Sequence, residues 1–80
     1  MNAFQKLLDF LARLDTAKIH YALRHFRDDT VAVEIAVPGE RWEVEFFADG
    51  SVEVEVFTNR ERPGLEGEEA LERLFATHGM

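Results

Sequence analysis

The segment from residue 41 to residue 57 alternates between apolar and acidic side chains almost without interruption. Alternation with a period of two indicates a half-buried β-strand, because successive side chains of a strand point to opposite faces of its sheet. The triplet Ala48-Asp49-Gly50 divides the segment into two antiparallel strands. We therefore predict a β-hairpin with one apolar and one acidic face. The apolar parity holds Trp42, Val44, Phe46, Val52, Val54 and Val56, and the other parity holds Glu43, Glu45, Glu53 and Glu55.

Length and composition limit what surrounds this hairpin. The chain has 80 residues and no cysteine, which predicts one domain over residues 1–80 without disulfides or a thiolate metal site. Charged residues interrupt the apolar N-terminal segment, which therefore resembles neither a signal peptide nor a membrane span. The net charge of −7 argues against binding to nucleic acid, which depends on clustered Lys and Arg. We expect a cytoplasmic protein with no nucleic acid or membrane partner.

Two segments have the spacing of amphipathic helices. A first helix is predicted over residues 2–18, with Asn2 as its N-cap and Phe10 beside the main stripe, where it widens the buried face. A second helix is predicted over residues 67–78, with acidic residues at its N-terminus and Gly79 after its end. The apolar stripes are Phe4, Leu7, Leu8, Leu11 and Leu14 in the first helix, and Ala70, Leu71, Leu74 and Phe75 in the second.

Between the first helix and the hairpin, two further alternating segments predict strands, around residues 19–25 and 31–37. Polar or Pro-Gly turns separate them, and residues 59–67 are expected to form an exposed connection to the second helix. The predicted fold is therefore an α+β two-layer sandwich of order α-β-β-β-β-α. A four-stranded antiparallel meander would carry both helices on its Val/Trp face.

Opposed residues in an antiparallel pair must point to the same face, which restricts the register of each hairpin. In the first hairpin, Phe26 opposite Thr30 satisfies this rule. In the second, Val37 opposite Trp42 does so, as does a tighter turn with Gly39 first. In the third, Phe46 opposite Val52 leaves Gly50 where a left-handed conformation favours glycine.

With these registers, five glutamates share the outer face of the sheet, with Glu34 beside Glu45. Directly opposed like charges are mildly destabilising, and only His20, Arg24 and Arg41 offset them here. Two phenylalanines would flank this charge as exposed aromatics. The face is either a solvated surface or a docking surface for a basic protein or a second copy of the chain. The candidate partner-binding residues are Glu34, Glu43, Glu45, Glu53, Glu55, Phe47 and Phe57.

The sequence contains no arrangement typical of an active site. There is no phosphate-binding glycine loop, no nucleophile with a neighbouring base and no pair of histidines spaced for a metal. His25 has the buried parity and is expected to be a core-edge residue. We therefore predict no catalytic residue, no metal and no cofactor. A small metal-dependent enzyme that uses His20 with nearby glutamates is the alternative.

The residues from Val37 to Phe46, followed by Asp49-Gly50 and Val52-Glu53-Val54, resemble a family of short uncharacterised bacterial proteins built round this hairpin. The residues from Leu23 to Asp29 are similar as well. This resemblance implies no activity or ligand. By analogy of shape and charge, the sequence predicts a non-enzymatic protein-interaction domain, such as an immunity protein or antitoxin, that binds a basic protein. A purely structural homodimeric domain is a further alternative.

Overall fold

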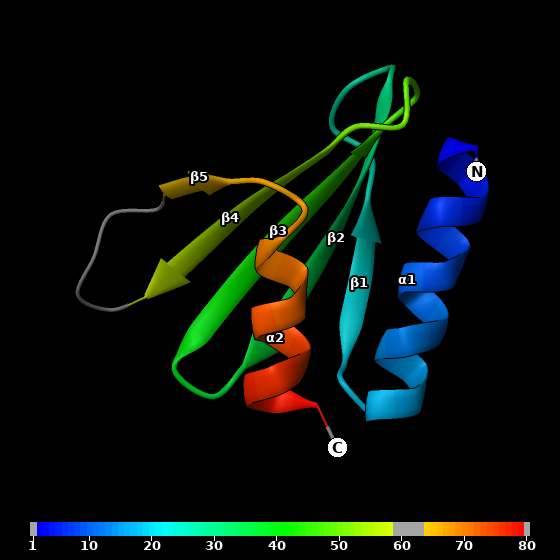
Figure 1. Ribbon diagram of the computed structural model, residues 1–80. Coiled ribbons are helices and arrows are strands. Elements are labelled where there is room, and N and C mark those ends of the chain that lie inside the picture. The colour runs from blue at the N-terminus through cyan, green and yellow to red at the C-terminus, as the bar shows by residue number, and fades with distance from the viewer. Residues whose placement is uncertain (1, 59–63, 80) are drawn as a thin grey trace.

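The computed structural model describes residues 2–58 and 64–79 and places two helices on one side of an antiparallel sheet (Figure 1). The predicted α+β architecture is confirmed. The sheet has the strand order β1-β2-β3-β4-β5, in which every strand pairs with its neighbour in sequence. In chain order, the elements are α1 (Ala3–Ala17), β1 (Tyr21–Arg24), β2 (Thr30–Val37), β3 (Glu40–Phe47), β4 (Val52–Thr58), β5 (Gly64–Glu66) and α2 (Ala70–His78).

The prediction of four strands is wrong by one, because part of the expected connection forms β5. This strand pairs antiparallel with β4, with Leu65 opposite Glu55 and Glu66 opposite Val54. Three residues are too few to show a hydrophobic period, and Gly64 and Gly67 at either end are typical of a loop. The remainder of that connection, residues 59–63, lies outside the described residues. The second helix is also shorter than predicted, since it begins at Ala70.

Helix α1 begins as predicted, with the Asn2 carboxamide oxygen accepting the backbone N–H of Gln5 at 2.7 Å. Its buried face, however, is rotated from the predicted stripe. Phe10 is 4% exposed, whereas Phe4 and Leu8 remain 68% and 41% exposed. The ring centres of Phe10 and Phe46 lie 5.4 Å apart, so the prediction that Phe10 widens the buried face is confirmed.

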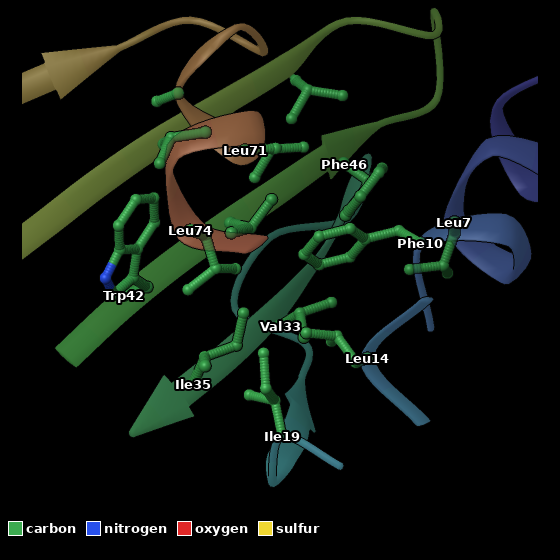
Figure 2. Packing of buried hydrophobic residues seen from close by; sticks show 14 of the residues in the cluster. Leu7, Phe10, Leu14, Ile19, Val33, Ile35, Trp42, Phe46, Leu71 and Leu74 are labelled. Atoms are coloured by element: carbon green, nitrogen blue, oxygen red, sulfur yellow. The ribbon is translucent and has the colours of Figure 1, made fainter. Parts of the chain in front are cut away.

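The core lies between the two helices and the inner face of β2, β3 and β4 (Figure 2). The indole N–H of Trp42 donates to the Glu40 carboxylate at 2.9 Å. His78 Nε2, at the end of α2, lies 3.2 Å from the same Glu40 oxygen. This contact joins the end of the helix to the start of β3. The largest fully buried side chains are Trp42, Leu14, Ile35, Leu74, Val33, Val44 and Val54.

Neither helix in the described part of the chain is long and apolar enough to cross a membrane.

Two of the three predicted hairpin registers are confirmed. Ala22 lies opposite Glu34, as the first register requires, and Phe46 lies opposite Val52, with Gly50 at a φ of 93°. The second register is wrong by two residues, because Val37 lies opposite Glu40. Pro38 and Gly39 alone form this turn.

The observed second turn follows from the sequence Pro-Gly. Gly39 has a φ of 79°. Proline at the second position of a turn and a glycine with positive φ at the third are the combination of a type II turn. Both predicted versions of this turn place Val37 opposite Trp42, with Gly39 either first in a two-residue turn or inside a longer loop. The predicted register of β3 against β2 therefore differs from the observed one by two residues. The apolar and acidic faces survive this error because a shift of two residues preserves parity.

The positive φ of Gly39 predicts that Gly39→Ala lowers the free energy of unfolding by about 1 kcal/mol, the approximate cost of a left-handed conformation for alanine. Gly64→Ala is a matched control, because a Cβ at Gly64 would meet open space and its φ is not in that region. It should be neutral or slightly stabilising. Urea unfolding followed by circular dichroism measures both, and equal losses would contradict the proposed turn.

Candidate protein-binding face

The five predicted glutamates do share the outer face of the sheet, on the side opposite the helices. We call Glu34, Glu43, Glu45, Glu53 and Glu55 the acidic face. Glu34, Glu43 and Glu55 are directly opposed across β2, β3 and β4, and Glu45 is opposed to Glu53. The corrected register thus places Glu34 beside Glu43 and not beside Glu45, whose neighbour on β2 is Ala32.

Three arginines form ion pairs with this face. Arg24 Nε lies 2.6 Å from Glu34 Oε1, and Arg41 Nη2 lies 3.4 Å from Glu43 Oε2. The sequence predicted both arginines as offsetting charges. His20, the third predicted one, precedes β1, and no ion pair joins it to the acidic face within the described residues. The face is therefore partly neutralised from within the chain.

Arg27 is a residue of this face that the sequence did not indicate. Its Nη2 and Nε lie 2.5 Å and 3.2 Å from the two carboxylate oxygens of Glu45, in a two-pronged contact. In the sequence, Arg27 begins the polar run Arg-Asp-Asp, which indicates a turn between two strands. The long side chain reaches back over the outer face from the β1–β2 loop, and no periodicity signals such a contact.

Glu45 is the most enclosed carboxylate with an arginine partner on this face. Its side chain is 17% exposed, and it also accepts a hydrogen bond of 2.8 Å from the hydroxyl of buried Thr30. Burial raises the pKa of Glu45, but the hydrogen bonds from Arg27 and Thr30 outweigh it and hold the pKa below its usual range. The same pair raises the pKa of Arg27, chiefly through the hydrogen bond to Glu45. Glu45 is therefore an ionised acceptor at neutral pH.

A hollow of about 210 Å³ lies within the acidic face. Carboxylates, one guanidinium and one exposed aromatic ring surround it, and Ala32 is 3% exposed among them. Carboxylates beside an aromatic ring favour a guanidinium or ammonium group, through ion pairing and cation–π contact. The lining residues are Phe26, Arg27, Ala32, Glu43, Glu45, Glu53 and Glu55.

The two phenylalanines proposed for partner binding are half-buried and not exposed as expected. The Arg41 guanidinium lies 4.4 Å from the ring centre of Phe57, and that of Arg27 lies 5.3 Å from the ring centre of Phe47. The chain's own arginines thus cover both rings. Phe26, which is 62% exposed, is the aromatic side chain that borders the hollow.

Glu53 and Glu55 differ from the other three glutamates of the acidic face. Both lie on β4, are half-buried and line the hollow. Neither forms an ion pair with any residue in the described ranges 2–58 and 64–79. Among the residues that the structure describes, they are the carboxylates of this face without an ion-pair partner.

The histidines do not join this face as a reactive group. His25 is exposed in the β1–β2 loop, so its predicted core-edge position is wrong; β1 ends at Arg24 and the chain leaves the sheet before it. Within residues 2–58 and 64–79, no group of three or more His, Asp or Glu residues is arranged to hold a metal ion.

Comparison of the chain with protein-family models, with curated proteins and with solved structures gives no match. The resemblance to a family of short bacterial proteins stays a prediction.

The lowered pKa of Glu45 predicts a specific dependence of stability on pH. A carboxyl group with a lower pKa in the folded than in the unfolded state stabilises the fold above the unfolded pKa, about 4.3 for Glu. That contribution is lost as the pH falls through the folded pKa. Glu45→Gln should therefore flatten the decline in unfolding free energy between about pH 5 and pH 3.

Thr30→Val provides a second test of this prediction, because it keeps the buried volume and removes one of the two side-chain donors to Glu45. It should flatten the decline in part. Urea unfolding at several pH values measures all three proteins. Parallel curves for wild type and Glu45→Gln would refute the role of Glu45.

Proposed function

We propose that this chain is a non-enzymatic protein-interaction domain that binds a basic segment of a partner protein on its acidic face, as an immunity protein or antitoxin would. The observation that carries the proposal is the pair Glu53 and Glu55. Both line the hollow beside exposed Phe26 without an ion-pair partner in the described residues. The proposal includes a cytoplasmic location and assigns neither a catalytic residue nor a cofactor.

The internal arginines support a guanidinium as the recognised group. Glu34, Glu43 and Glu45 each form an ion pair with an arginine of the same chain. The contact between Arg27 and Glu45 has the two-pronged geometry that favours arginine over lysine in carboxylate recognition. An arginine of the partner would occupy the neighbouring position at Glu53 and Glu55.

Repulsion between opposed glutamates favours binding of a cation over simple solvation of this face. Opposed glutamates repel one another by a few tenths to about 1 kcal/mol per pair, and Glu45 and Glu53 are one such pair. Arg27 forms its ion pair with Glu45 and interacts with Glu53 only through a weaker Coulomb attraction, so most of the relief lies on the side of Glu45. A cation from a partner would relieve it at Glu53 and Glu55, and it would also be attracted over a distance by the net charge of −7.

The proposal predicts that Glu53→Gln/Glu55→Gln weakens binding of the partner roughly tenfold, because it removes both available carboxylates. The experiment is affinity capture from a lysate of the source organism with the full chain as bait, at low and at high salt. The captured protein is identified by mass spectrometry, and its affinity is then measured by calorimetry.

A matched control is Asp9→Asn/Glu69→Gln, which changes the net charge equally but alters exposed residues outside the acidic face. The control should capture the same basic protein as wild type, and higher salt should reduce the yield for both. The proposal fails if wild type retains no basic protein at either salt concentration. It also fails if the two double variants retain a basic protein equally well.

A further inference from the structure

The edge of the sheet at β1 presents apolar side chains to solvent. β1 is the first strand of the sheet and pairs with β2 alone, so its other side has no strand partner within the described residues. Leu23 has the inner parity, opposite buried Val33, yet it is 49% exposed. Inner positions of β2 and β3 such as Val33 and Val44 are fully buried. The inner face of the sheet is thus incomplete at this edge.

Helix α1 continues the exposed apolar surface beyond β1. Phe4 and Leu8 lie one helical turn apart and are 68% and 41% exposed. Asp15 follows along the same side of the helix at positions spaced by three or four residues, and it lines a surface hollow together with Tyr21 of β1. This side of α1 therefore faces the β1 edge, and Figure 1 shows the helix running alongside that strand.

The charge distribution identifies what could cover this surface. Residues 16–27 contain no Asp or Glu and form the longest such run in a chain with a net charge of −7. Within this run, Arg24 and Arg27 are paired with Glu34 and Glu45 of the same chain, and Lys18 is the one further Lys or Arg. The β1 edge is therefore nearly neutral. Two copies of an acidic chain can approach one another here with little of the repulsion that would oppose contact elsewhere.

We propose that the β1 strands of two copies pair antiparallel and join their two sheets into one. This pairing is isologous, so it closes as a dimer with a two-fold axis perpendicular to the sheet. We assign the register in which Leu23 lies opposite Leu23 of the partner subunit. Arg24 then lies opposite the partner's Ala22, and no two arginines are directly opposed. The inner parity of both copies is preserved, as pairing within one sheet requires.

The exposed area fits a moderate affinity. The exposed parts of Phe4, Leu8 and Leu23 together give on the order of 300 Å² of apolar surface per copy. With the strand backbones added, the contact lies near the lower limit of about 1,000 Å² for a specific interface. We therefore expect a dimer with a dissociation constant of roughly 1 to 100 μM.

The dimer is independent of the proposed function but has a consequence for it. An axis perpendicular to the sheet keeps both acidic faces on the same side of the joined sheet, with the helices of both copies on the other side. Two hollows would then be presented to one partner, and a partner with two basic segments would gain affinity through multivalency.

The test is sedimentation velocity of the full chain from about 1 μM to about 500 μM, a range that brackets the expected dissociation constant. Wild type should shift from monomer to dimer within it. Leu23→Lys should weaken the dimer at least tenfold, because a charge on an edge strand opposes strand pairing. The matched control is Leu65→Lys, which alters another exposed leucine, in β5 at the opposite edge of the sheet, and should leave the dimer intact.

Leu8→Lys tests the same surface from the helix, so the result does not depend on β1 alone. It should also weaken the dimer, and circular dichroism verifies that each variant is folded. Hydrogen exchange should show the amides of β1 slowed as wild type dimerises. The proposal is overturned if wild type stays monomeric over the whole concentration range. It is also overturned if Leu65→Lys dissociates the dimer while Leu23→Lys and Leu8→Lys both leave it intact.

Discussion

Burial of alternate side chains of β2, β3 and β4 beneath the two helices is the interaction on which the rest of the structure depends. Five of these side chains are almost completely buried, and each contributes about 1.5 to 3 kcal/mol. The three opposed glutamate pairs on the outer face cost at most about 1 kcal/mol each. Hydrophobic burial therefore determines which face is inside, and the glutamates are forced together on the other. The buried side chains are Val33, Ile35, Trp42, Val44 and Val54.

The chain reduces the repulsion on its outer face with its own arginines. Exposed ion pairs contribute little stability individually, but these three are distributed over three glutamates that would otherwise face like charges. Arg27 has a second effect, because its loop covers part of the sheet and leaves Ala32 and Thr30 buried on the outer parity. A flat sheet thereby acquires a hollow, with Glu53 and Glu55 on its β4 side.

Local patterns predicted the parts of the fold that depend on local physics. The alternation of β3 and β4 fixed their faces, and Ala48-Asp49-Gly50 fixed their register, because that loop needs a positive φ that Gly50 supplies. Two errors in the predicted fold, the register of the second hairpin and the missing fifth strand, also have local causes. The Pro38-Gly39 turn has several solutions of the same parity, and β5 is too short for a pattern to appear. The burial of Phe10 was partly predictable, since it lies beside the stripe, but its position depends on Phe46 and Phe75.

The sequence by itself determined that this is an α+β domain and that its glutamates share one face, because side-chain parity along a strand follows from backbone geometry alone. Only the tertiary structure decided which of those glutamates are neutralised. Arg27 meets Glu45 across 18 residues of sequence, and Arg24 meets Glu34 across 10. Such contacts depend on how a loop and two strands are arranged in space, and a hydrophobic pattern carries no information about where a long charged side chain ends.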